Sequence, residues 1–315
     1  MLSSKKIAKF HLPGLFEFYE LYRAFLPLYR NHREWFYEWC EIASIYGTPS
    51  DCVWGGGRVG FGDDIAEEVV ALLNEYQISP RLTFSNSLLT EKHLSDKKCN
   101  ALSSTFHEKS KTKTGIVIYS DLLLDYLKKK FSDFYFVSST TKVLTEFEDF
   151  KMELQRDDFE YVVPDFRLNK SFEKLASLSD EEKDKVEFLC NECCWCGCKD
   201  RKACYENVSR KSLGEENLSV CDDNCSVDEN GDFICHAPGG EAGYSFSRAM
   251  KNPMFISKDD ILEKYLPMEF SNFKIEGRGL GSAMVLEFLL YYLVKPECQI
   301  EVREKIYLDS MLDLF

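Results

Sequence analysis

Short apolar runs alternate with amphipathic segments along most of this chain. The runs are rich in β-branched and aromatic residues and are apolar on both faces, which is typical of strands buried in a parallel sheet. The segments between them repeat apolar residues every three or four positions, which predicts helices. The predicted strands are 51–57, 81–86, 115–121, 134–140, 161–165, 185–192 and 272–278, with a weaker eighth at 99–105.

The first 46 residues do not follow this alternation. Aromatic and aliphatic residues recur at mixed spacings of three and four between positions 14 and 43, with a break near Pro27. This spacing predicts helices rather than strands. We therefore interpret 1–46 as an N-terminal helical part that covers one end of the domain.

Seven or eight buried parallel strands favour a (β/α)8 TIM-barrel-like fold, and an open doubly wound sheet is the alternative. A chain of 315 residues can bury one large core, so we expect a single barrel domain over 1–315. Within it, 190–244 is rich in cysteine, acidic residues, glycine and asparagine. This segment is predicted to be a metal-binding insertion with a long loop that covers the mouth of the barrel.

The charge and the apolar runs restrict the partners and the location. A net charge of −14 makes bulk nucleic acid an unsuitable partner, because nucleic acid is bound chiefly through clustered Lys and Arg. The apolar run 280–294 carries Glu287 and is short for a membrane span. Pro13 and Glu17 interrupt the stretch where a signal peptide needs apolar residues. We expect a cytoplasmic protein that acts on a small molecule, with no membrane segment.

Thirteen cysteines remain to be explained in a reducing compartment, where dense cysteines bind metal more often than they form disulfides. Nine of them lie between 190 and 235. Cys40, Cys52, Cys99 and Cys298 are scattered singly, and we expect them to be small buried residues. The clustered cysteines are therefore the ones that carry candidate chemistry.

Within the cluster, Cys194 and Cys198 form a C-x3-C pair on a segment that leaves a predicted strand. Four thiolates suit either a tetrahedral Zn site or a 4Fe-4S cluster, and the spacing alone does not separate the two. Cys190 and Cys193 belong to the end of the strand, where we interpret them as thiols of the core or of the surroundings of the site.

In a barrel, the chemistry lies at the carboxyl ends of the strands. We interpret the serines and Asp165 at these ends as loop and helix-cap residues. Arginine can hold a carboxylate or phosphate with two parallel hydrogen bonds, and a glutamate can act as a base or pair with the arginines. The catalytic candidates are Glu276, Arg278 and Glu192, and the substrate-binding candidates are Arg58, Asn86 and Asn191. The alternative is a ring of salt bridges that only closes the barrel.

The stretch from Lys274 to Arg278, Lys-Ile-Glu-Gly-Arg, is followed by an apolar helix ending near aromatic residues. It resembles peptidase family U thirty-two, the collagenase-like peptidase superfamily, and the cysteine segment also resembles that family. The resemblance implies a barrel fold. It also implies relatives that are iron-sulfur proteins, which hydroxylate ubiquinone precursors or RNA bases without molecular oxygen.

For this chain the resemblance favours a 4Fe-4S cluster over Zn. The implied ligands are Cys194, Cys198 and Cys235, with the fourth from Cys204 or Cys221. An electron-donor protein would be a partner of such a centre.

Three classes of function stay open. The first is an iron-sulfur barrel enzyme acting on a polar or anionic small molecule. The second is a peptidase-like hydrolase, but neither G-x-S-x-G nor H-E-x-x-H occurs, and the five histidines form no obvious pair. The third is a non-catalytic binding protein in which Zn or a cluster ties a loop to the barrel. We rank the iron-sulfur enzyme first, the hydrolase second and the binding protein third.

Overall fold

Eight parallel strands form the centre of the molecule in the order β6-β5-β4-β3-β2-β1-β8-β7. The computed structural model describes residues 6–56, 65–214, 233–238, 244–277 and 279–311. A parallel bridge between Val162 and Val186 joins the end of β6 to the start of β7, so the ring of strands is nearly closed. The strands are β1 (Ala8–Pro13), β2 (Cys40–Gly47), β3 (Ser79–Phe84), β4 (Gly115–Ile118), β5 (Tyr135–Ser138), β6 (Tyr161–Val162), β7 (Glu187–Leu189) and β8 (Asn272–Lys274).

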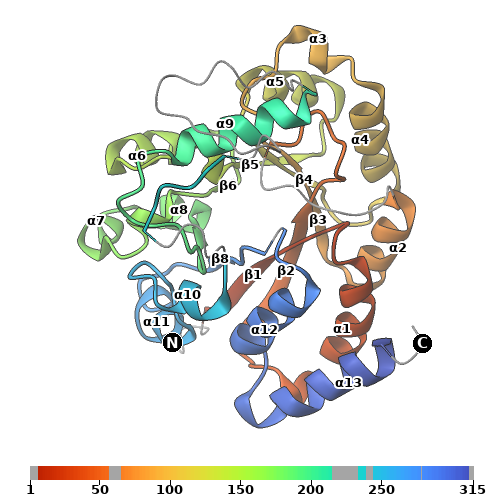
Figure 1. Ribbon diagram of the computed structural model, residues 1–315, viewed down its shortest axis with the longest axis vertical. Helices are drawn as coiled ribbons and strands as arrows, with labels where there is room; N and C mark the ends of the chain where they lie inside the picture. Colours follow the sequence, from red (N-terminus) through yellow and green to blue (C-terminus); the bar gives the residue numbers. More distant parts are fainter. Residues whose placement is uncertain (1–5, 57–64, 215–232, 239–243, 278, 312–315) are drawn as a thin grey trace.

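Helices surround this ring (Figure 1), which confirms the predicted (β/α)8 TIM-barrel-like fold. They are α1 (Tyr19–Asn31), α2 (Ala66–Tyr76), α3 (Glu91–Leu94), α4 (Lys97–Lys109), α5 (Asp121–Lys130), α6 (Phe147–Leu154), α7 (Phe172–Ala176), α8 (Asp180–Lys185), α9 (Arg201–Ser212), α10 (Phe246–Met250), α11 (Lys258–Asp260), α12 (Ser282–Leu293) and α13 (Gln299–Met311). Short 3-10 turns occur at η1 (Arg33–Trp35), η2 (Thr140–Lys142), η3 (Phe166–Leu168) and η6 (Pro296–Cys298), and a π turn at η5 (Ile261–Tyr265). Within the described ranges, no helix has both the length and the apolar character needed to cross a membrane.

Alternation along the strands separates two kinds of interior. On β3, Leu82 and Phe84 belong to the large apolar core between strands and helices. Arg81 is on the other face and points into the barrel, where it reaches Glu187 of β7. A small separate cluster of Val117, Val137, Val163 and Leu189 fills part of the barrel interior. Both faces of each strand are therefore buried, as expected for a parallel barrel.

The N-terminal prediction was wrong in part. Residues Ala8–Pro13 and Cys40–Gly47 are strands, and they pair with each other in parallel. Only the stretch between them follows the helical spacing, in α1. The aromatic residues of 14–39 masked the two short strands because buried strands have no helical or alternating period of their own.

Two predicted strands are corrected as well. Residues 51–56 form turns after β2, and 99–105 lie inside α4. The other six predicted strands each overlap a real one, β3 to β8. Within the predicted insertion 190–244, helix α9 occupies Arg201–Ser212.

Candidate functional site

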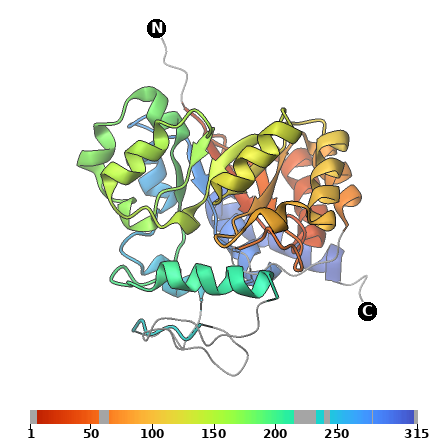
Figure 2. The ribbon, with the colours of Figure 1, turned by 90° about the horizontal axis from the view of Figure 1, so that it is seen from above.

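Helix α9 lies over the carboxyl end of the barrel. Near its C-terminal end, Ser209 accepts a hydrogen bond on its backbone oxygen from Asn86, which follows β3 (3.1 Å). At its first residue, Arg201 reaches Glu192, which follows β7 (2.8 Å). In Figure 2 this helix is drawn in teal, and it extends across this end of the barrel beneath both halves of the ring. The helix therefore ties together strand ends from different parts of the barrel.

A buried network of two carboxylates and two guanidinium groups lies beneath the start of α9. Arg201 Nη2 donates to Glu192 Oε2 at 2.8 Å, and its Nε lies 3.3 Å from Asp165 Oδ2. Arg167 Nε donates to Asp165 Oδ1 at 2.7 Å. Glu192, Asp165 and Arg201 are no more than 3% exposed. The pairing is required, because an unpaired buried charge is strongly destabilising.

The network holds the backbone of the cysteine segment. Glu192 Oε1 accepts hydrogen bonds from the backbone N–H groups of Cys193 (2.8 Å) and Cys194 (3.1 Å). Arg167 Nη1 donates to the backbone oxygen of Cys198 at 3.0 Å. Asn252 donates to the backbone oxygen of Cys194 at 2.9 Å. The turn from 193 to 198 is thus fixed over the barrel mouth from several sides.

The thiols on this turn are partly accessible. Cys193, Cys194, Cys196, Cys198 and Cys204 are half-buried, and none of the described cysteines forms a disulfide. Cys235 is exposed on a later segment, whereas Cys190 is fully buried at the end of β7.

The predicted ligands do not form a ready-made metal site in the part of the chain that the structure describes. There, no three His, Cys, Asp or Glu side chains come together to hold a metal ion. The described positions of Cys194, Cys198, Cys204 and Cys235 therefore do not fit a preassembled centre. Cys221, the alternative ligand, lies outside the described residues, and the ligand set stays a prediction.

Two of the predicted substrate-binding residues have amide groups that hold loops. Asn191 donates to the backbone oxygen of Glu276 (2.9 Å) and accepts from its N–H (2.7 Å), which joins the ends of β7 and β8. Asn86 donates to the backbone oxygen of Val53 (2.9 Å) and accepts from the N–H of Leu88 (2.9 Å). Both amides are fully buried. They support the site rather than face a substrate.

Glu276 is half-buried beside Asn191 at the end of β8. Glu192 uses its carboxylate on the cysteine turn and on Arg201, so it positions other groups. Arg58 and Arg278, the two predicted anion-binding arginines, lie outside the described residues. The structure thus brings Asn86, Asn191, Glu192 and Glu276 to the carboxyl end, as predicted. The structure confirms the cap prediction for Asp165, whose side chain accepts from the backbone N–H of Arg167 at the start of η3. Sequence reasoning missed Arg201 and its ion pair with the same carboxylate.

A second charged cluster lies inside the barrel. Glu187 of β7 pairs with Arg81, and its Oε1 is 3.5 Å from Lys274 Nζ. His11 Nε2 is 3.5 Å from Glu187 Oε2, and Lys274 Nζ lies 3.7 Å from the centre of the Tyr46 ring. These side chains come from strands far apart in sequence, so only the closed barrel brings them together.

Burial and charge set the protonation of this cluster. Burial, with the nearby Arg81 charge, lowers the pKa of His11 to about 3, so its imidazole is neutral at physiological pH. Burial alone would raise the pKa of Glu187, but Arg81, His11 and Lys274 lower it to about 2. Burial lowers the pKa of Lys274 to about 8. The carboxylate therefore stays charged and offsets the buried cations.

His11 also contacts Ser44 through Nδ1, at 2.8 Å from Oγ. Ser44, His11 and Glu187 are linked in the same order as the serine, histidine and carboxylate of a hydrolase triad. The resemblance is limited to this order. None of the three side chains is more than 1% exposed, so a substrate carbonyl has no access to Ser44. We interpret this group as part of the barrel interior.

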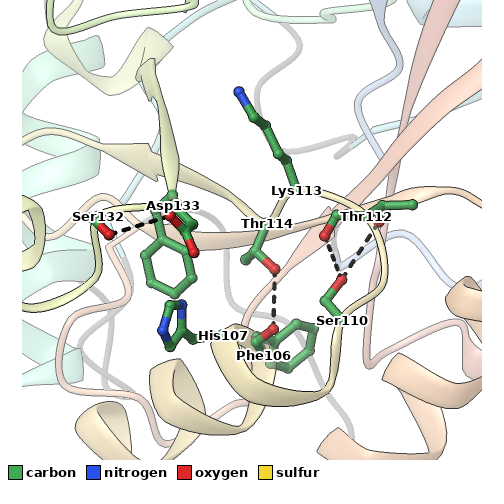
Figure 3. Close-up of a pocket in the computed structure, with 9 residues that line it drawn as sticks. Phe106, His107, Ser110, Thr112, Lys113, Thr114, Ser132 and Asp133 are labelled. Atoms are coloured by element: carbon green, nitrogen blue, oxygen red, sulfur yellow. Dashed lines mark hydrogen bonds between the residues drawn. The ribbon is translucent and has the colours of Figure 1, made fainter.

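A surface hollow of about 430 Å³ lies elsewhere on the molecule (Figure 3). It is lined in part by His107, Lys113, Thr114 and Phe134. Thr114 directly precedes β4 and Phe134 directly precedes β5, so the hollow lies at the amino ends of the strands. Because barrel enzymes carry their chemistry at the opposite end, we do not assign the active site to it.

No protein-family model matches the chain, and no curated protein matches it significantly. Among solved structures, it is similar to the one described as the U32 peptidase Mk0906, with 13% sequence identity and a TM-score of 0.49. The likeness covers 88% of this chain and 95% of that chain. That protein bears the name of the family that residues 274–278 resemble. At this level of similarity we draw no conclusion about activity.

Proposed function

We propose that the protein is a barrel enzyme that binds a metal centre through the thiolates of Cys194 and Cys198, with Cys235 and either Cys204 or Cys221 as further ligands, and acts on a polar or anionic small molecule at the barrel mouth. The observation that carries this proposal is the buried network of Glu192, Arg201 and Asp165, which fixes the backbone of the cysteine turn. Burying several charges costs free energy, and a loop that only connects two elements has no need of it.

The electrostatic setting supports thiolate chemistry on this turn. Burial alone would lower the pKa of Arg201, but attraction to neighbouring anionic groups, Cys194 among them, raises it well above its usual value. Arg201 therefore places a buried positive charge near Cys194, where it would offset the negative charge of thiolate ligands of a metal centre. Thiolates are the form that binds metal.

The resemblance favours a 4Fe-4S cluster, with oxygen-independent hydroxylation as the reaction and an electron-donor protein as partner. Zn is the alternative, since thiolate ligands suit both. Because the described thiols do not form a three-donor group, we assign no step of a reaction to the centre. Glu276 is the half-buried carboxylate at the barrel mouth and is the candidate for proton exchange with a bound substrate.

The test is metal and sulfide analysis of protein purified without oxygen, together with its absorption spectrum. The Cys194→Ser, Cys198→Ser double variant should lose most of the metal. The matched control is Cys40→Ser, Cys298→Ser, two cysteines outside the segment, which should retain it. Iron with sulfide supports the cluster enzyme, whereas stoichiometric Zn without colour favours the non-catalytic class. Full metal content in the Cys194, Cys198 variant would refute the proposal.

A further inference from the structure

Two cysteines outside the clustered segment meet in the structure. Cys52 lies after β2 and Cys99 lies in the first turn of α4, and their Sγ atoms are 3.1 Å apart. Both are reduced, and they are 2% and 0% exposed. They are 47 positions apart in the chain, and single cysteines at such a distance give no sign of contact in a sequence. The barrel therefore creates a dithiol that the sequence does not reveal.

The segments that carry the two thiols are also held together by other contacts. Asp51 forms an ion pair with Lys98, directly beside the thiols. The indole of Trp54 donates a hydrogen bond to the backbone oxygen of His93 at 2.8 Å. These contacts hold the two segments in place, and the short distance between the two sulfur atoms is part of this packing.

The two thiols are not equivalent. Burial raises the pKa of Cys52, but hydrogen bonds from Cys99 and from the backbone N–H groups of Trp54 and Gly55 outweigh burial and lower it. The hydrogen bond to Cys52 is the largest effect on Cys99, and burial adds to it, so the pKa of Cys99 is raised. The lowered pKa makes Cys52 the more easily ionised of the two thiols, and the raised pKa of Cys99 disfavours the loss of its proton.

We propose that Cys52 and Cys99 are a redox-active pair that forms a reversible disulfide when the protein meets hydrogen peroxide. The Cys52 thiolate attacks one peroxide oxygen, the O–O bond breaks, and Cys52 becomes a sulfenic acid while hydroxide leaves. The sulfur of Cys99 then attacks the Cys52 sulfur, the S–S bond forms and the S–O bond breaks. The proton of Cys99 leaves with the displaced hydroxide as water. The hydroxide of the first step takes up the proton that Cys52 lost on ionising. In total, two thiols lose two electrons and two protons, and the peroxide becomes two waters.

The bond would tie the segment after β2 to α4. That segment is already in contact with the end of β3, because Asn86 donates from its backbone N–H to the oxygen of Trp54 (3.0 Å) and from its side chain to Val53. Oxidation would therefore stiffen one side of the carboxyl end of the barrel. It does not depend on the proposed metal centre.

The direct test uses the intact, reduced protein treated with hydrogen peroxide. The remaining thiols are then alkylated in denaturant, and the peptides are analysed by mass spectrometry. We expect a peptide pair linked through Cys52 and Cys99 that disappears after dithiothreitol. Cys40, equally buried, is the internal control and should stay alkylated. Alkylation of both Cys52 and Cys99 at a peroxide dose that oxidises the half-buried thiols of 193–204 would overturn the proposal.

Two single variants test the roles of the thiols. In Cys99→Ser, the Cys52 sulfenic acid has no thiol to meet, so it should accumulate and be labelled by dimedone. In Cys52→Ser, Cys99 should remain unlabelled. Labelling of Cys99 instead of Cys52 would contradict the assignment of the attacking thiol.

Thermal unfolding gives an independent measurement. Oxidation of the wild-type protein should raise the melting temperature by roughly 5 °C, because a cross-link over a long loop restricts the unfolded chain. Dithiothreitol should reverse the rise, and Cys99→Ser should not show it. The same cross-link in the Cys194→Ser, Cys198→Ser variant would show that this pair works without the metal centre. Loss of the cross-link in that variant would show that the pair depends on the metal centre.

Discussion

The molecule buries two clusters of charge, one inside the barrel and one at its carboxyl end. Inside, Glu187 is surrounded by Arg81, Lys274 and His11, all of them side chains of strands. At the mouth, the carboxylates of Glu192 and Asp165 face Arg201, and they hold loop backbone. Both clusters pair carboxylates with cationic side chains. The interior cluster consists of strand side chains, whereas the mouth cluster also contacts loop backbone.

We therefore interpret the interior cluster as structural and the mouth cluster as a support of the candidate site. The interior cluster is enclosed by the strands of the barrel, so its charges serve one another. The mouth cluster extends to a turn whose thiols are half-buried, so a change there is transmitted to groups that reagents and ligands can reach. Substitutions in the interior should therefore change stability alone, and substitutions at the mouth should change stability and thiol chemistry together.

The largest effect is expected for Glu187→Gln. It removes the carboxylate that pairs with Arg81 and Lys274 and leaves both cations buried, which should cost about 3–5 kcal/mol of unfolding free energy. Urea denaturation measures the loss. Alkylation rates of Cys194 and Cys198 in the folded variant should match the wild type, and faster alkylation would contradict the proposed separation of the two clusters.

Arg201→Met should destabilise less, by about 2–3 kcal/mol, because the partners keep other contacts. Asp165 retains Arg167, and Glu192 retains the two backbone N–H groups. The cysteine turn should nevertheless loosen, so alkylation of Cys194 should accelerate several-fold. Arg201→Lys is the control, since it keeps the charge. If Arg201→Met leaves the alkylation rate unchanged, the mouth cluster is structural only.

Acid should destabilise the protein through the interior cluster. The folded pKa of His11, about 3, lies below the value of about 6.5 in an unfolded chain. As the pH falls below 6.5, the unfolded state takes up the proton first, so stability present above pH 6.5 is lost on acidification. Each such group contributes at most about 1.4 kcal/mol per pH unit.

Glu187 acts in the same direction at lower pH. Its folded pKa of about 2 lies below the usual value of 4.5, so its contribution is lost below that value. Unfolding free energies of the wild type and of His11→Gln, measured at about pH 7 and about pH 5, test the His11 part. The variant should show the smaller decrease, and an equal decrease would mean that His11 does not titrate as proposed.

The smallest effect is expected at the surface. Arg303 pairs with Glu287 at 2.9 Å, but the two side chains are 34% and 40% exposed. Arg303→Gln should cost less than about 1 kcal/mol, since exposed pairs are screened by water and salt. A loss comparable to that of Arg201→Met would show that burial is not the reason why the ion pairs of the two clusters contribute more to stability than an exposed pair.

Most of the barrel could be predicted from the chain, because buried parallel strands leave apolar runs that local pattern reveals. Six of the predicted runs overlap β3 to β8. The failures have local causes. The residues of β1 and β2 flank an aromatic helix, and its helical spacing dominated the pattern of the whole region. Residues 99–105 lie in α4, where small residues show no clear helical periodicity of apolar positions.

The sequence predicted where the candidate site lies, but not what the individual side chains do there. Asn191 and Glu192 do lie at the end of β7, but hydrogen bonds to backbone occupy their side chains. Arg201 could have been noticed as a basic residue within the cysteine segment, yet nothing in its neighbours indicates the carboxylate of Asp165. The ligands of a metal centre stay a prediction.

The sequence by itself determined the βα repeat, the end of the barrel where polar residues gather and the concentration of thiols in one segment. These depend on the order of residue types over a few positions. Only the tertiary structure decided which distant residues meet: His11 with Glu187, Arg201 with Asp165, and Cys52 with Cys99. The packing of the barrel sets those contacts, since it brings together strands, loops and helices that no local pattern relates.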